Sequence, residues 1–284
     1  MYQHYPTRKE IFTSSTCGDY QLFIAWPDEP APEKGWPVIY LLDGDVHFPV
    51  VETLMRTLAR PRCCMTPGVV VAIGYQEGTL RERDYRPAVA QRVPEPNPCG
   101  GYYPIGLAGQ SEAFLAFIQH ELKPYIRQAF SVDPKREALF GHTYGGLFTL
   151  NTLFTCRHAF QHYYASSPSV WWNEGYINST ATDFLQVEVT EAHPTAPVLF
   201  LSVGEWEQSL ERWELALPEV QREALRQHRC QRRMVDGVRE LSWRLQAAGR
   251  DKLDVSLFIH SGQSHQSVPL LSLQQAFMHH FQRL

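Results

Sequence analysis

The stretch from Ala138 to Leu150 most constrains how this chain can fold, because two apolar runs flank a glycine-rich turn. The first run, Ala138 to Phe140, ends at Gly141, and the second starts at Leu147. Thr143 lies between them, in the spacing Gly-x-Thr-x-Gly that ends at Gly145. This spacing matches a nucleophile elbow, a sharp strand-to-helix turn, with threonine where serine is usual.

An elbow of this kind places unusual demands on its residues. We expect a Cβ at Gly141 or Gly145 to collide with neighbouring backbone, which explains the two glycines. The central residue presents its oxygen at the start of a helix, where the amide of Tyr144 can bind an oxyanion. Thr143 is β-branched and stiff at χ1, and positive φ in such a residue costs roughly 1–3 kcal/mol. We therefore expect a nucleophile position with weakened or lost activity, although the motif alone also fits a non-catalytic turn.

Composition and charge limit the classes of protein that remain. The chain has 284 residues, 44% of them hydrophobic and 20% charged, which predicts one domain over residues 1–284. The net charge of −4 argues against a nucleic-acid partner. No run of apolar residues is long enough to span a membrane, and the N-terminus has no apolar core like that of a signal peptide. Six cysteines without a Cys-x-x-Cys motif favour reduced thiols, so we expect a cytoplasmic protein.

Hydrophobic periodicity predicts eight strands. Residues 11–16 and 20–26 are predicted to form an antiparallel hairpin. The later strands alternate with helical patterns, which predicts an α/β fold with a mostly parallel sheet and helices on both faces. These later strands are expected at residues 38–42, 69–73, 138–140, 163–165, 197–203 and 253–259.

Two long segments interrupt this alternation. Residues 75–110 lack periodicity and are rich in proline and glycine, as in a functional loop beside a site. Residues 205–250 form a second insertion, in which 218–248 is predicted to be helical. The eight arginines and four acids of residues 218–250 fit either a solvated helix face or a lid whose cations meet an anionic substrate. Pro124, inside the helical pattern of residues 114–126, predicts a kink or an early end.

Three polar residues follow predicted strands in an informative order. Thr143 follows the fifth strand, Glu207 the seventh and His265 the eighth. All three are thus expected at the carboxyl ends of parallel strands, in the order nucleophile, acid, histidine. Acyl transfer needs this set, because a histidine takes the nucleophile's proton and a carboxylate orients the histidine. His265 could instead be an exposed histidine, and Glu205 competes with Glu207 unless both are simply solvated.

A second oxyanion donor is expected in the turn after the third strand. Gly44 lets the backbone approach closely, so the amide of Gly44 or of Asp45 is the candidate. A metal site at Asp43 and Asp45 is discounted because no histidine or third acid is suitably spaced nearby. His158 and His162 have a spacing that can bind zinc on a helix, but no third ligand accompanies them. No metal or organic cofactor is therefore predicted.

Tryptophans gather after the sixth and seventh strands, on the side of the sheet where the site is expected. Core packing accounts for some of them, but the clustering favours an aromatic-lined pocket for an acyl or aryl group. The residues concerned are Trp171, Trp172, Trp206 and Trp213.

In these motifs the chain resembles the esterase D-like branch of the α/β-hydrolases, which includes enterobactin (siderophore) esterases and feruloyl-type esterases. The resemblance covers about Pro37 to Val268, and it implies the α/β-hydrolase fold and ester hydrolysis. It also implies that Arg83 contacts a substrate carbonyl or phenolate. The matching segments are Tyr40–Asp45, Arg83–Pro87, Gly141–Phe148, Ser167–Trp172, Val203–Glu205 and His265.

The sequence therefore predicts a hydrolase of carboxylic esters. Siderophore trilactones and simple acyl or aryl esters are both open as small-molecule substrates. Since Thr143 replaces the family's serine, a non-catalytic protein that keeps the pocket and only binds its ligand is the alternative.

Overall fold

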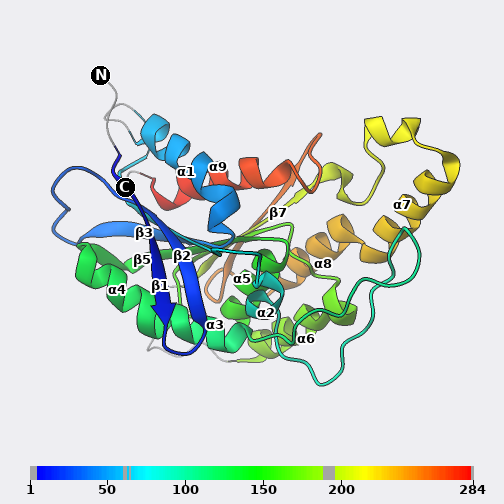
Figure 1. Ribbon diagram of the computed structural model, residues 1–284, viewed down its shortest axis with the longest axis horizontal. Helices are drawn as coiled ribbons and strands as arrows, with labels where there is room; N and C mark the ends of the chain where they lie inside the picture. The colour runs from blue at the N-terminus through cyan, green and yellow to red at the C-terminus, as the bar shows by residue number, and fades with distance from the viewer. Residues whose placement is uncertain (1–4, 60–62, 64, 188–195, 283–284) are drawn as a thin grey trace.

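An eight-stranded sheet forms the centre of the computed structural model, which describes residues 5–59, 63, 65–187 and 196–282 (Figure 1). The strand order is β1-β2-β4-β3-β5-β6-β7-β8. β1 and β2 pair antiparallel, as do β2 and β4, and all other neighbours are parallel. The strands are β1 (Thr7–Ser14), β2 (Gly18–Ala25), β3 (Trp36–Leu41), β4 (Val69–Gly74), β5 (Val132–His142), β6 (His162–Ser166), β7 (Val198–Gly204) and β8 (Asp254–His260). The predicted hairpin and the mostly parallel sheet are confirmed.

The central strands are continuous apolar runs because helices cover both of their faces. Every residue of β3 and β4 is buried. β3 pairs in register with β5, where Leu41 lies opposite Phe140, so the turns that follow these two strands start at the same level. This register places the predicted elbow beside the turn after β3.

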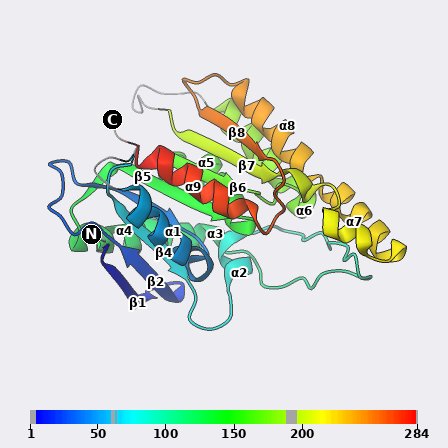
Figure 2. The same ribbon diagram turned by 90° about the horizontal axis from the view of Figure 1, so that it is seen from above.

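Helices form a layer on each side of the sheet, as predicted. α1 and α9 cover one face and contribute Val51, Met55, Leu273 and Phe277 to its core (Figure 2). α3, α4, α5, α6 and α8 contribute to the core on the other face. None of the described helices is long and apolar enough to cross a membrane. The helices are α1 (Gly44–Leu58), α2 (Arg81–Tyr85), α3 (Ser111–Phe117), α4 (Lys123–Ala129), α5 (Tyr144–Thr155), α6 (Trp172–Gln186), α7 (Glu219–Arg232), α8 (Met234–Gln246) and α9 (Val268–His280).

The structure differs from the sequence expectations at several helices. A π-helical turn, Ile118–Leu122, joins α3 to α4, so Pro124 falls in the first turn of α4 and does not end the helix. The predicted helix over residues 218–248 is broken at Arg233, which adopts the left-handed conformation at φ 46° between α7 and α8. Two helices, α2 and α6, were not predicted.

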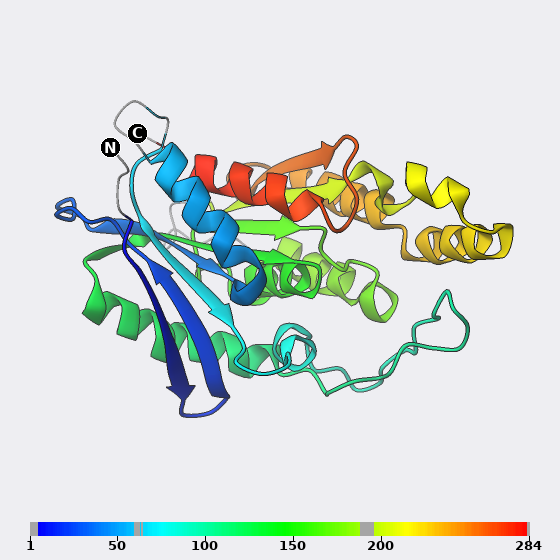
Figure 3. The same cartoon turned by 45° about the horizontal axis from the view of Figure 1, so that its top comes forward.

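The two long insertions project from the same end of the sheet. Figure 3 shows α7 and the segment after α2 extending side by side beyond the carboxyl ends of the strands. No residue of α7 is buried, whereas α8 buries one apolar face against the sheet. α7 is therefore held by polar contacts, such as the ion pair of Arg229 with the buried Glu214, and not by a buried apolar face.

A cluster of histidines lies at the opposite end of the sheet from these insertions. His162, at the start of β6, has its Nδ1 2.8 Å from Nδ1 of His280, near the end of α9. Burial lowers the pKa of His162 from its ordinary 6.5 to about 4, with a smaller contribution from His279. Burial also lowers the pKa of His280 well below its usual range. Both rings are therefore neutral in the folded protein near neutral pH.

These histidines should make the protein less stable in mild acid. The unfolded chain takes up a proton at position 162 as the pH falls through 6.5, while the folded chain does so only near 4. The free energy of unfolding should therefore drop, with His162 contributing roughly 2 kcal/mol between pH 7 and pH 5. Urea unfolding at both pH values measures this. His162→Asn should lose less stability over the same interval, and an equal loss in both proteins would contradict the assignment.

Candidate active site

Thr143 forms the turn between β5 and α5 in a strained backbone conformation, with φ 58° and ψ −115°. A Cβ on Gly141 would lie 2.2 Å from the carbonyl oxygen of Gly145, so only glycine fits there. The expected collision at Gly145 is wrong: a Cβ there would meet nothing closer than Leu42 Cδ1 at 3.4 Å. The second crowded position is Gly146, where a Cβ would lie 2.8 Å from Cα of Pro168. The sharpness of the turn thus depends on Gly141 and Gly146.

The structure brings together the three polar residues that follow strands five, seven and eight. Oγ1 of Thr143 lies 2.8 Å from Nε2 of His265. On the other side of the ring, Nδ1 of His265 lies 2.6 Å from Oε2 of Glu207. A hydroxyl, an imidazole and a carboxylate are therefore in hydrogen-bond contact in series, which is the geometry that nucleophilic acyl transfer needs.

The two candidate acids have different surroundings. Glu207 is buried, and its Oε1 accepts hydrogen bonds from Oγ of Ser167 at 2.5 Å and from the amide of Gly204 at 2.7 Å. Glu205 is exposed and instead accepts hydrogen bonds from the Gly262 amide and the Ser261 hydroxyl, which lower its pKa. Glu207 is thus the acid that contacts His265.

Ser167 was not predicted as a site residue. It is fully buried directly after β6 and adopts φ 40°, which aims its hydroxyl at Glu207. The sequence does place a serine and a proline at the end of a strand beside the elbow strand. Nothing in the sequence, however, shows that the Ser167 side chain turns back toward a carboxylate 40 residues later.

A second histidine lies beside the first. The rings of His142 and His265 have centroids 4.6 Å apart. The Ser166 hydroxyl donates its one hydrogen to Ser272 Oγ, so it can only accept a hydrogen bond from a further partner. Nδ1 of His142, which lies 3.1 Å from Ser166 Oγ, is therefore the donor in that contact. Burial lowers the pKa of His142 well below its ordinary value, and the nearby His265 lowers it further. His142 is therefore a neutral ring of defined tautomer packed against His265.

The predicted oxyanion donors lie in the first turns of two helices. Tyr144 is the first residue of α5, and Gly44 and Asp45 are the first two of α1. Amides in the first turn of a helix have no acceptor within the helix, so they are free to bind an anion. The residue before Gly44 is Asp43, which adopts φ 53°. Across the described residues, no group of three or more His, Cys, Asp and Glu is arranged to hold a metal ion.

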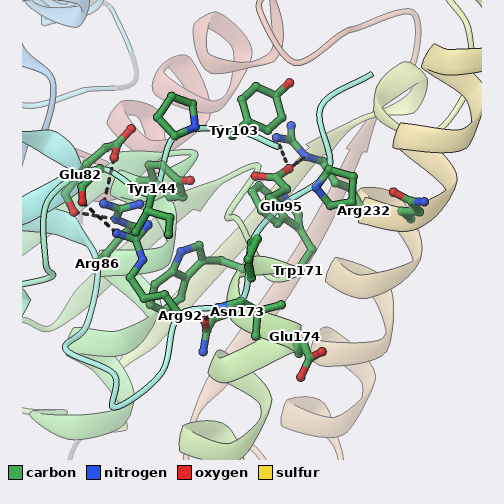
Figure 4. Close-up of a pocket in the computed structure, with 18 of the residues that line it drawn as sticks. Glu82, Arg86, Arg92, Glu95, Tyr103, Tyr144, Trp171, Asn173, Glu174 and Arg232 are labelled. Atoms are coloured by element: carbon green, nitrogen blue, oxygen red, sulfur yellow. Dashed lines mark hydrogen bonds and ion pairs between the residues drawn. The ribbon is translucent and has the colours of Figure 1, made fainter. Parts of the chain in front are cut away.

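A cavity of about 460 Å³ opens beside the elbow, between the two insertions (Figure 4). Tyr144, the residue after Thr143, contributes to its wall, and so do the predicted Trp171 and Trp172. Trp213 is exposed and lies outside this wall. Loop residues that include Tyr103 complete the wall, together with residues of α7. The cavity therefore combines aromatic faces with the polar groups of the two insertions.

Arg83 does not line this cavity. Its Nε donates to Asp84 Oδ1 at 2.6 Å, and its Nη2 donates to the carbonyl of Cys17 at 3.0 Å, so its guanidinium is held on the hairpin side of the sheet. The expectation of a substrate contact at Arg83 is therefore at odds with its position. The arginines that do line the cavity are Arg86, Arg92 and Arg232.

Ionic contacts across the cavity connect the two insertions. Glu95, from the segment after α2, pairs with Arg232 at 2.5 Å and lies 3.5 Å from His228, both on α7. The Arg232 guanidinium also lies 4.2 Å from the centroid of the Trp171 ring. These contacts hold α7 over the cavity, as in a lid, but the charge of Arg232 is met by Glu95. That its cations meet an anionic substrate stays a prediction.

Comparison with known proteins places the chain in a family. A family profile described as "Putative esterase" matches residues 13–240. The ferri-bacillibactin esterase BesA of Bacillus subtilis is 34% identical over 256 residues, covering 88% of this chain and 80% of that one. The siderophore triacetylfusarinine C esterase of Aspergillus fumigatus is 30% identical over 284 residues, covering 98% and 94%.

Solved structures agree with this placement. The siderophore hydrolase EstA from Aspergillus nidulans matches with a TM-score of 0.83 at 31% identity, covering 96% of this chain and 93% of that one. Together with the sheet order and the elbow, these likenesses show that the chain has the α/β-hydrolase fold and belongs to the esterase family that includes the siderophore esterases.

Proposed function

We propose that the protein hydrolyses carboxylic esters of the siderophore class through Thr143, His265 and Glu207. The observation that carries this proposal is the unbroken series of contacts from Thr143 Oγ1 through the His265 ring to Glu207, at 2.8 Å and 2.6 Å. Membership in a family whose named relatives act on siderophores supports the choice of substrate.

In the first half of the reaction, Oγ1 of Thr143 attacks the ester carbonyl. His265 takes the hydroxyl proton on Nε2, and Glu207 holds the imidazolium that forms. The negative charge on the carbonyl oxygen is bound by the amide of Tyr144 and by that of Gly44 or Asp45. The tetrahedral intermediate then collapses, the carbon–oxygen bond of the ester breaks, and His265 returns its proton to the leaving alcohol.

The second half uses the same groups on a water molecule. His265, neutral again, takes a proton from water as the water attacks the acyl carbonyl on Thr143. Collapse of this intermediate releases the carboxylic acid, and the proton on His265 returns to Oγ1 of Thr143. No metal or organic cofactor takes part in either step.

The lining of the cavity beside Tyr144 suits a substrate whose acyl part carries an aromatic or polar group. Trp171 and Tyr103 supply ring faces. Arg232 is paired with Glu95 and Arg86 with Glu82. The described partners of Arg92 are instead the carbonyl oxygens of Gly106 and Leu107. Arg92 is therefore the cavity cation that we propose to meet an anionic oxygen of the substrate.

Threonine at the nucleophile position weakens this chemistry through its methyl group. The 2.8 Å contact with His265 shows that the hydroxyl of Thr143 is aimed at its base, so a misdirected χ1 does not account for any loss. The methyl group remains beside the attacking oxygen, where it crowds the incoming carbonyl. The strain of a β-branched residue at φ 58° adds to the cost.

Replacement of this threonine tests the proposal. Thr143→Ser should raise kcat/KM on p-nitrophenyl butyrate by at least tenfold, since a barrier lower by about 1.4 kcal/mol is a factor of ten. It should also raise the rate at which a siderophore trilactone is opened, as followed by chromatography of the products. The serine form should be no less stable in a thermal melt, because serine lacks the β-branch that adds to the strain of this positive φ.

His265→Ala in the Thr143→Ser protein provides the control, because it removes the base and should abolish the gain. A folded Thr143→Ser protein that remains inert would sink the hydrolase proposal. Binding of the siderophore by such an inert protein would then support a non-catalytic ligand-binding role.

The acid is tested by a matched pair of substitutions. In the Thr143→Ser protein, Glu207→Gln should lower kcat by roughly 10³-fold or more, because the amide cannot hold the imidazolium. Glu205→Gln should change kcat by less than about threefold, since its partners are Ser261 and Gly262. Steady-state kinetics on the same ester compare the two, and the reverse ranking would assign the acid to Glu205.

A further inference from the structure

The side chain of Arg81 bridges the two turns that carry the proposed oxyanion donors. Arg81 is the first residue of α2. Its Nε donates to Oδ1 of Asp43 at 3.0 Å, and its Nη2 donates to Oδ2 of the same carboxylate at 3.2 Å. The same Nη2 lies 3.3 Å from the carbonyl oxygen of His142, to which it also donates. One guanidinium therefore contacts the end of β5 and the turn after β3 together.

One of these contacts falls on a residue with positive φ, and the other falls on the residue before one. Asp43, at φ 53°, directly precedes Gly44, and His142 directly precedes Thr143, at φ 58°. Non-glycine residues hold positive φ only where the surroundings fix them. Both turns end at a helix whose first amides face the substrate side in the proposed mechanism. The distance between these amides depends on how the two turns are held against each other.

Arg81 is itself firmly placed. Its guanidinium carbon lies 5.7 Å from the ring centroids of both Tyr85 and Tyr144. The hydroxyl of Tyr85 accepts a hydrogen bond from the amide of Asp43 at 3.1 Å. The turn after β3 is thus fixed through its backbone by Tyr85 and through its side chain by Arg81.

The pairing also has an electrostatic consequence. Oδ2 of Asp43 lies 3.5 Å from the position that a Cβ on Gly145 would occupy, so this carboxylate is beside the first turn of α5. An unpaired carboxylate there would repel an oxyanion bound at the Tyr144 amide. The guanidinium of Arg81 cancels that charge with a two-point contact.

We propose that Arg81 is a positioning residue for the oxyanion-binding turns: it sets the spacing of the two donors and neutralises Asp43. This inference rests on the proposed hydrolase function. The proposed role belongs to Arg81 and not to Arg83, which lies two positions later on the same short helix. Successive residues of a helix turn by about 100°, so these two side chains leave α2 on opposite sides. Arg83 accordingly reaches Asp84 and the hairpin.

The test uses the Thr143→Ser protein as parent. Arg81→Gln should lower kcat for p-nitrophenyl butyrate by roughly 10²-fold, as expected when an oxyanion donor is displaced, and should leave KM within about twofold. Phenylboronic acid, whose tetrahedral adduct imitates the intermediate, should lose affinity by a similar factor in calorimetry. Arg81→Lys keeps the charge but not the two-point contact, so its kcat should be intermediate.

Asp43→Asn shows whether the two residues act as a unit. The Arg81→Gln/Asp43→Asn protein should be no slower than Arg81→Gln alone, because the uncompensated carboxylate is gone. Arg157→Gln is the matched control. Arg157 also lies over an aromatic ring, at 5.5 Å from Phe184, and donates to a carbonyl, that of Lys252, but it is far from both turns. Its kcat should equal that of the parent.

The outcomes separate this inference from the hydrolase proposal. An active parent whose kcat is unchanged by Arg81→Gln would overturn the positioning role and leave the hydrolase function intact. The positioning role would also be overturned if the losses of kcat from Arg81→Gln and Asp43→Asn were additive in the double variant. A loss of kcat in Arg157→Gln as large as that in Arg81→Gln would overturn it as well. A parent that neither hydrolyses esters nor binds the boronic acid would overturn both. If Arg81→Gln fails to fold, Arg81→Lys and Asp43→Asn give the same comparison from either side of the contact.

Discussion

The positive φ of Thr143 is the constraint on which the rest of the site depends. Hydrogen bonds from three directions hold this conformation. The Thr143 amide donates to Ser166 O on β6 at 3.1 Å, while its carbonyl accepts from Leu147 at 2.9 Å and from Ser169 at 3.1 Å. Because β6, α5 and the loop after β6 all converge on one residue, the hydroxyl is aimed by the architecture of the sheet. The position can therefore accommodate threonine without losing its contact with His265.

The order of the three candidate catalytic residues along the chain could be predicted from the sequence, because it depends on the topology of the sheet. Thr143, Glu207 and His265 each follow a strand, and parallel strands bring their carboxyl ends to one edge. The choice between Glu207 and Glu205 was harder, since both lie within one short turn. The contacts of the two side chains support Glu207: its carboxylate is buried against Ser167 and His265, whereas that of Glu205 lies in solvent against the loop after β8.

What could not be predicted depends on side-chain direction and on pairings far apart in sequence. The sequence pointed to Arg83 as a substrate contact, but which arginine of α2 faces the turns depends on where that short helix begins. The hydroxyl row of Ser166, Ser202 and Ser272 joins two strands to α9 and fixes the tautomer of His142. Each of these serines alone is an ordinary small polar residue. Likewise, an apolar pattern does not reveal that Arg233 adopts a left-handed conformation and divides one helix into two.

α7 buries none of its residues, and its link to the opposite wall of the cavity is the contact of Glu95 with Arg232 and His228. Apolar burial barely responds to added electrolyte, but contacts between partly exposed charges weaken as mobile ions screen them over about 8 Å at physiological ionic strength. The sheet and the cavity roof therefore differ in how far their contacts depend on ionic strength. We expect the sheet and its two cores to keep their shape at high salt, and any loosening to be confined to the roof over the cavity.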